Sequence, residues 1–200
     1  MVGLAIVVLS LAIVAPGFAD WIQNSRVRSY AESLQNALQF ARAEAVRRNT
    51  TVSFQIASTL DNSCVLTVSG SFWVVSAGSA DATGACGTAV SDPTSNSIST
   101  SAGPFVLQAG PPETSLSSIS LLATQPVIAF NGLGQLTTTS GAQAATVALT
   151  TFQITSPNGS CVAAGGSVRC LDIVVSSGGQ TRMCDPGLTS SATNNDPMAC

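Results

Sequence analysis

"AIVAPGFADWIQNSRVRSY", residues 12–30, joins an apolar run directly to a charged segment with a helical pattern. Pro16 stands near the end of the apolar run, and no loop signal separates the two halves. A cleaved signal peptide has no reason to continue as an amphipathic helix beyond its cleavage site. The stretch therefore predicts one long helix whose two halves lie in different surroundings.

Residues 1–19 form the apolar half, in which no residue is charged and Ser10 is the only strongly polar side chain. As a helix they would measure about 28 Å, close to the ~30 Å hydrocarbon core of a bilayer, so we expect a membrane segment. Pro16 cannot donate a hydrogen bond to the carbonyl of Ala12, which predicts a kink or local melting. The side chains expected in the apolar environment are Val2, Leu4, Ile6, Val7, Leu9, Leu11, Ile13, Val14 and Pro16.

Residues 20–49 form an amphipathic continuation of the same helix. Apolar residues recur there at spacings of three and four, which places them on one stripe that is expected to pack on a sheet. Glu44 and Arg48 are spaced to pair across one turn, and the helix is expected to end near Asn49. The stripe consists of Val27, Ala31, Leu34, Leu38, Ala41 and Ala45.

Residues 50–200 change to the period of two that is typical of strands, and turn signals such as "NGLG" at 131–134 separate the runs. They predict a β-rich domain with an antiparallel sheet built of hairpins, so the expected fold class is α+β. Residues 78–117 are read as a long loop region with one strand around residues 105–107. The expected strands are 51–57, 64–68, 72–76, 126–130, 135–138, 145–154 and 168–177.

The charge is unevenly distributed. Five of the seven basic residues lie within 20–49 beside three acids, whereas residues 50–200 hold Arg169 and Arg182 against seven acids, which gives −5. Nonspecific nucleic-acid binding needs clusters of Lys and Arg, and none lies outside the helix. Arg182, within "GQTRMCDP" at 179–186, is read as a solubilising side chain, with a weak DNA contact as the alternative.

All six cysteines lie beyond the helix, and no CxxC pair or histidine completes a zinc site. Disulfides formed in an oxidising compartment explain them best, with buried free thiols as the alternative. Six cysteines allow fifteen pairings. A bridge that closes the last loop of about 17 residues would constrain the unfolded chain by roughly 3 kcal/mol. The pairs favoured by this argument and by proximity are Cys184–Cys200, Cys64–Cys86 and Cys161–Cys170.

The sequence contains no arrangement that is typical of catalysis. Histidine and lysine are absent, the ten acids are scattered, and no GxSxG elbow or glycine-rich phosphate loop occurs. "NGS" at 158–160 matches a glycosylation sequon but is read as a hairpin turn. We therefore expect a protein that is not an enzyme and that holds no cofactor or metal.

The helix carries a family resemblance. "LAIVAPGFADWIQNSRVRSYAESLQNALQFARAEAVRRN", residues 11–49, resembles the N-terminal helix of type IV pilin-like proteins. Its latter half, residues 34–49, resembles the FimT/FimU/GspH family of minor pilins and pseudopilins in particular. "FWVV" at 72–75, "IAFNGLGQLT" at 128–137 and the ending in "DPMAC" at 196–200 are similar to that family as well.

The resemblance implies a pilin-like fold and a minor pilin that assists assembly or priming of a type IV pilus. Such a subunit waits in the inner membrane with its globular domain in the periplasm, and the apolar half of its helix later forms part of a filament core. The implied partners are membrane lipid, other minor pilins and the major pilin, or pseudopilins. The alternatives are a DNA-binding minor pilin, a type II secretion pseudopilin and a secreted protein cleaved after Ala19.

Two features depart from the family pattern. The family helix begins with a prepilin peptidase site, an aromatic residue and a glutamate, whereas this sequence opens with "MVGLAIVV". The start is therefore expected to be mis-assigned, or to lie roughly six residues inside a mature helix that just reaches membrane length. Family members linked to DNA uptake have a GRxR pattern, of which Gly179 to Arg182 retains only the second arginine.

Overall fold

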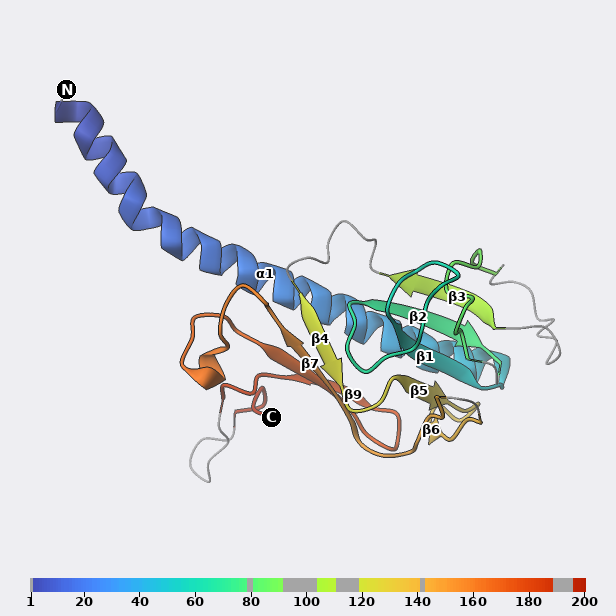
Figure 1. The fold of residues 1–200 in the computed structure, drawn as a ribbon. Helices are drawn as coiled ribbons and strands as arrows, with labels where there is room; N and C mark the ends of the chain where they lie inside the picture. The colour runs from blue at the N-terminus through green and yellow to red at the C-terminus, as the bar shows by residue number, and fades with distance from the viewer. Residues whose placement is uncertain (1, 79–80, 92–103, 111–118, 141–142, 189–195) are drawn as a thin grey trace.

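The computed structural model describes the chain except residue 1 and segments 79–80, 92–103, 111–118, 141–142 and 189–195; of residues 2–17 it describes the backbone. One helix, α1 (Val2–Arg48), runs along the molecule, and its N-terminal part extends beyond the sheets (Figure 1). The helix passes through Pro16 without a break. Of the two expected outcomes, a kink or local melting, the melting is absent from the described backbone, and the N-terminal part of the ribbon is bent (Figure 1).

The membrane prediction for residues 1–19 concerns mostly the side chains of residues 1–17, which lie outside the described part of the chain. From Val2 to Pro16, the apolar side chains named above are among them. Within the residues that are described, no helix is long and apolar enough to cross a bilayer.

The C-terminal end of α1 follows the sequence prediction closely. Asn49 takes the left-handed conformation, with a φ of 48°. Its N–H donates to the carbonyl of Val46, and the N–H of Thr50 donates to the carbonyl of Ala45, both at 3.2 Å. These two bonds form a Schellman motif, which satisfies carbonyls that the end of a helix otherwise leaves unpaired.

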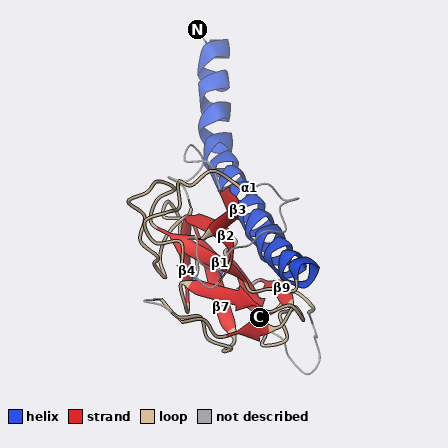
Figure 2. Ribbon diagram, turned by 90° about the vertical axis from the view of Figure 1, so that its right-hand side faces the viewer, coloured by secondary structure: helices blue, strands red, loops and turns tan. Residues whose placement is uncertain are grey.

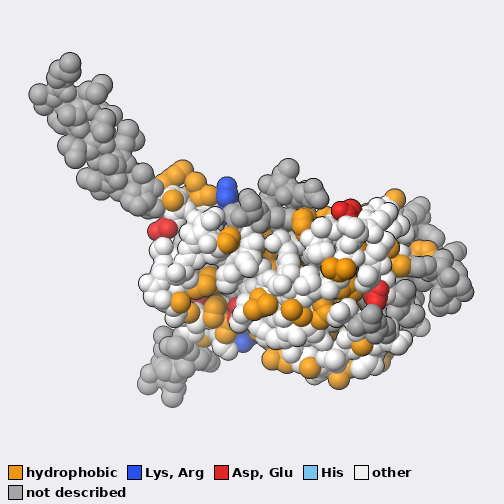
Figure 3. Space-filling model, viewed as in Figure 1, with side chains coloured by type: hydrophobic (Ala, Val, Ile, Leu, Met, Phe, Trp, Pro, Cys, Tyr) orange, Lys and Arg blue, Asp and Glu red, His pale blue; other side chains and the backbone are white. Residues whose placement is uncertain are grey.

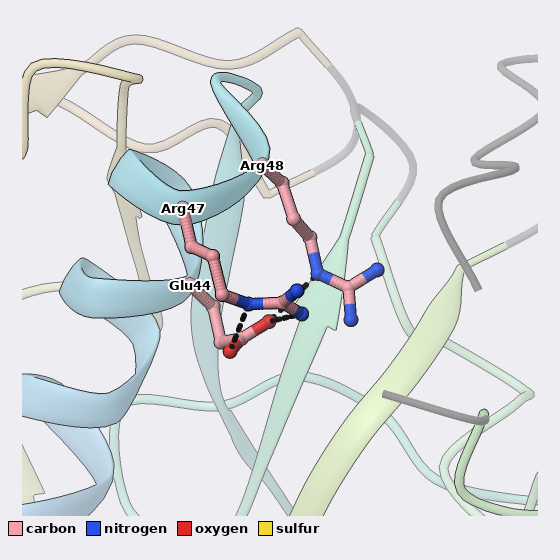
Figure 4. A network of polar contacts seen from close by, with 3 residues as sticks. All are labelled: Glu44, Arg47 and Arg48. Carbon is pink, nitrogen blue, oxygen red and sulfur yellow. Dashed lines mark hydrogen bonds and ion pairs between the residues drawn. The ribbon is translucent and has the colours of Figure 1, made fainter. Parts of the chain in front are cut away.

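Glu44 organises the last turn of the helix (Figure 4). Its carboxylate accepts hydrogen bonds from Arg47 at 2.7 and 2.9 Å and from Nε of Arg48 at 2.7 Å, so the predicted Glu44–Arg48 pair is present. The Arg47 hydrogen bond is the largest cause that holds the pKa of Glu44 below its usual range. Arg47 and Arg48 lie at the C-terminal end of α1, where positive charge also interacts favourably with the helix dipole.

Nine strands form two antiparallel sheets within the described residues. The first sheet has the order β3-β2-β1-β5-β6, and the second has the order β4-β7-β8-β9. The strands of the first sheet are β1 (Val52–Ala57), β2 (Phe72–Ala77), β3 (Phe105–Gly110), β5 (Val127–Phe130) and β6 (Leu136–Thr137). Those of the second are β4 (Ser120–Ala123), β7 (Thr150–Thr155), β8 (Leu171–Val175) and β9 (Thr181–Cys184).

Two expected strands are wrong in whole or in part. Residues 64–68 form only one bridge, Leu66 to Ala57, because β2 and β5 already occupy both edges of β1. Residues 145–149 are irregular, and β7 begins at Thr150. β4 and β9 are not among the expected strands, because each has only four residues, too few to show a clear period of two.

Both sheets lie on the same side of α1 (Figure 2). The six residues of the predicted helix stripe are fully buried, and Tyr30 and Ala37 are buried beside them. The ring of Phe54 in the first sheet packs against Phe152 of the second at 5.7 Å between centroids. The two sheets and the helix therefore share one hydrophobic core.

All six cysteines form disulfides within the sheet domain. The bonded pairs are the three that chain proximity favours: Cys64–Cys86, Cys161–Cys170 and Cys184–Cys200. Cys161–Cys170 closes the connection between β7 and β8, and Cys184–Cys200 fastens the C-terminus to the end of β9. No disulfide reaches the helix.

Candidate functional site: the base of the protruding helix

The base of the helix, residues 18–28, is where α1 leaves the globular domain (Figure 1). Two polar side chains fix this segment to the second sheet. The hydroxyl of Ser156 donates to Oε1 of Gln23 at 2.6 Å, and the backbone N–H of Arg169 donates to Oδ1 of Asn24 at 2.7 Å. One contact comes from the end of β7 and the other from the loop closed by Cys161–Cys170, and together they hold the helix at a defined position.

Two aromatic side chains at the base of the helix face solvent. Phe18 is 59% exposed and Trp21 is 64% exposed, and their rings stack with centroids 5.8 Å apart. In Figure 3, hydrophobic side chains lie directly beside the part of the helix that is drawn in grey, and a basic side chain lies close to them. Exposed aromatic pairs of this kind are suited to a membrane interface or to a partner protein.

A cavity of about 390 Å³ lies between the base of the helix and the C-terminal part of the second sheet. This volume is within the range of small-molecule sites. Trp21 lines it from the helix, and Leu188 and Met198 line it from the C-terminal disulfide loop. Its apolar lining consists of Trp21, Leu171, Met183, Leu188 and Met198.

The same cavity has a charged rim. Arg28, Arg169 and Asp185 line it together with Asn24 and Ser25. Nε of Arg28 forms an exposed ion pair with Glu32 at 2.9 Å, and Oδ1 of Asp185 accepts a hydrogen bond from the N–H of Gly187 at 2.8 Å. The cavity thus brings two cations and one buried carboxylate to the edge of an apolar surface.

Asp172 on β8 lies near this carboxylate. Burial is the main cause that raises the pKa of Asp172, and the charge of Asp185 raises it further. An acid whose pKa is higher in the folded state destabilises that state above this pKa, because the unfolded chain ionises more readily. Neither carboxylate was singled out by the sequence analysis, because scattered acids give no signal without the register of β8 and β9.

Replacing Asp172 with Asn should therefore raise the free energy of unfolding at pH 7. The gain should shrink as the pH falls and disappear below the pKa of the unfolded chain, where both states bind the proton. Urea unfolding at pH 7 and pH 3 measures this gain in the free energy of unfolding, and Asp81→Asn is the control. A loss of stability at pH 7 would mean that the carboxylate makes a favourable contact instead.

A second tight contact joins the helix to both sheets at the far end of the domain. Nε of Arg42 donates to the carbonyl of Gly134 at 2.9 Å, in the turn between β5 and β6. Gly179, in the turn between β8 and β9, has a φ of 75°, and a Cβ there would overlap the same carbonyl oxygen. Glycine is required at this position by both its conformation and its surroundings.

Arg182 lies apart from the cavity. Met183 lines the cavity, and side chains alternate along a strand, so Arg182 on β9 faces the other side of the sheet. Its cross-strand neighbour is Val174, and Asp172 and Cys184 form the next pair on that side. No group of metal-ligating side chains occurs among the described residues.

One long helix, two antiparallel sheets on one of its sides and three disulfides define a pilin-like α+β fold. The family model described as type II transport protein GspH matches residues 30–179, and the chain belongs to this family. The expected membership of the FimT/FimU/GspH family is thereby confirmed, and the chain is a minor pilin or a pseudopilin.

Two solved structures are similar to the chain, both crystal structures of the type IV minor pilin FimU of Pseudomonas aeruginosa strain PAO1. The form in space group P21 is 18% identical with a TM-score of 0.48, and the match covers 82% of this chain and 91% of FimU. The form in P65 is 19% identical with a TM-score of 0.44 and covers 78% and 90%. A search of curated protein sequences gives no match.

Proposed function

We propose that the chain is a minor pilin that assists assembly or priming of a type IV pilus. Residues 1–19 anchor it in the inner membrane with the sheet domain in the periplasm, and the subunit is later transferred into the filament. The observation that carries this proposal is the division of α1: residues 27–45 are packed under the sheets, whereas the part before residue 18 extends away from them (Figure 1).

This division separates two tasks along one helix. The packed part fixes the sheet domain to α1, because the apolar stripe on this part of the helix is fully buried. The extended part is left to contact lipid or the helices of other subunits, such as other minor pilins and the major pilin. Apolar helices of neighbouring subunits can replace lipid, so transfer into a filament need not expose the apolar run to water. The proposed role is structural and needs no catalytic group.

Deletion of the gene tests this role. We expect fewer surface pili by electron microscopy and reduced twitching, both restored by the full chain. Trp21→Asp should fail to restore them, because it places a charge beside the anchor, whereas Val46→Asp, at an exposed apolar position near the other end of the helix, should restore them. Unchanged pili and twitching in the deletion strain would refute the proposal.

A pseudopilin of a type II secretion system is the second candidate, because the matching family model is described as a type II transport protein. Its partners would be other pseudopilins. Secretion of a type II substrate by the same deletion strain separates the two candidates. Lost secretion with normal pili supports the pseudopilin, and normal secretion with lost pili supports the minor pilin.

DNA capture is not favoured by the charges around Arg182. We expect no gel shift of double-stranded DNA by the detergent-solubilised chain even at low salt, and no difference between wild type and Arg182→Gln. The physical reason is that electrostatic binding requires several phosphate contacts, whereas Arg182 shares its side of the sheet with Asp172. Salt-dependent binding that Arg182→Gln abolishes would contradict this prediction.

A further inference from the structure

We propose that the cavity at the base of the helix binds the headgroup of an aminophospholipid in the bilayer. Arg28 and Arg169 would bind its phosphate, and Asp185 would bind its ammonium group. This inference rests on the membrane anchor of the proposed function, but it assigns to the globular domain a lipid contact that the anchor does not require.

The charges in the cavity match a zwitterion. Arginine donates to phosphate through two parallel N–H bonds, and two arginines line the cavity. The Arg28–Glu32 ion pair uses Nε, which leaves the two terminal nitrogens of that guanidinium to donate. The buried carboxylate of Asp185 supplies a counterion for an ammonium group.

The same carboxylate disfavours a headgroup that carries only negative charge. Asp185 is mostly buried, and an added anion beside it would be repelled more strongly than in water. The apolar lining, including Leu171, Met183 and Met198, suits the glycerol and the first methylenes of a lipid. The cavity therefore favours a zwitterionic lipid with a primary amine over an acidic lipid.

The position of the cavity agrees with the depth of a headgroup layer. If the hydrocarbon core ends near residue 19, Trp21 and Asn24 lie about 3 and 8 Å beyond it along the helix. Headgroups occupy roughly 5–8 Å on each side of the core. Arg28 then lies about 14 Å beyond the core, which is about 6 Å outside that layer and a distance that its long side chain can span.

Lipid is a better occupant than soluble phosphoethanolamine because of effective concentration. A headgroup held in the membrane is presented to the cavity continuously, so even weak binding fills the site. The small soluble group would have to bind from bulk solution, without the apolar contacts of the lipid. The stacked, exposed Phe18 and Trp21 place the cavity next to the surface that supplies the lipid.

The test uses the full chain in nanodiscs that contain phosphatidylcholine with equal amounts of phosphatidylethanolamine and phosphatidylglycerol. Native mass spectrometry then identifies the lipid that stays on the released protein. We expect retained phosphatidylethanolamine to exceed phosphatidylglycerol. Arg169→Gln should lower its retention about tenfold, as the loss of one charge-assisted hydrogen bond implies. Asp185→Asn should abolish the preference between the two lipids.

Arg182→Gln is the matched control, because it removes the same charge from the opposite side of the sheet, and it should behave as wild type. Intact masses that confirm three disulfides show that each variant is folded. Equal retention of the two lipids by wild type, or equal retention by Arg169→Gln and Arg182→Gln, would overturn the inference while leaving the anchor intact. Displacement by the same concentration of soluble phosphoethanolamine would also overturn it. Failure of the chain to enter nanodiscs would overturn the anchor and the inference together.

Discussion

Replacing Gly179 with Ala should lower the free energy of unfolding by about 2–5 kcal/mol, the sum of the costs of a left-handed conformation and an overpacked contact. The new Cβ would overlap the carbonyl oxygen of Gly134, which also accepts the hydrogen bond of Arg42. The substitution therefore disturbs the point where the helix and the two sheets meet. Urea denaturation of the detergent-solubilised, oxidised chain measures the loss.

The control is the preceding glycine. A Cβ at Gly178 would have the hydroxyl of Ser176 as its nearest neighbour, at 3.9 Å, and the backbone there is not left-handed. Gly178→Ala should change the free energy of unfolding by no more than about 0.5 kcal/mol. Equal effects of the two substitutions would mean that the contact between the two turns does not contribute to stability.

Leu34→Ala should cost about 2–5 kcal/mol, the range for removing a fully buried leucine side chain. Leu34 is 0% exposed and lies midway along the packed part of the helix, in contact with the core that both sheets share. The cavity left there cannot collapse easily, because a rigid helix lies on one side and two sheets on the other. Emission of buried Trp73, in a Trp21→Phe background, reports the unfolding transition.

Leu133→Ala makes the same chemical change at a position that is 78% exposed, in the turn between β5 and β6. It should leave the stability unchanged within about 0.5 kcal/mol. A small effect at Leu34 would mean that the helix is held mainly by its polar contacts at Gln23, Asn24 and Arg42, and not by its apolar stripe.

The helix was predictable because its signals are local. The apolar stripe, the Glu44–Arg48 spacing and the Asn49 terminus each lie within a few residues of chain, and each appears in the structure. The disulfide pairs follow from short loops for the same reason. The division into two sheets was not predictable, since it depends on which strand edges remain free after distant strands have paired.

The candidate site was likewise predictable only where its signals are local in the sequence. Trp21 after an apolar run is a local signal for an interface, although the sequence analysis did not use it. Met183, Met198 and Asp185 come together with the helix only through the register of β8 with β9 and the Cys184–Cys200 bond. No local pattern reports such a combination, and the cavity therefore required the fold.

The disulfides have a consequence for how a filament subunit bears load. All three close within residues 64–200, so apart from the peptide linkage between α1 and β1, a pull along α1 reaches the sheet domain through side-chain packing and hydrogen bonds. Because the stripe runs parallel to the pull, its contacts would share the tension in shear and would not peel apart one at a time. If these contacts gave way, the disulfides would still crosslink three loops within residues 64–200, so the packing between α1 and the sheets would yield before those loops open.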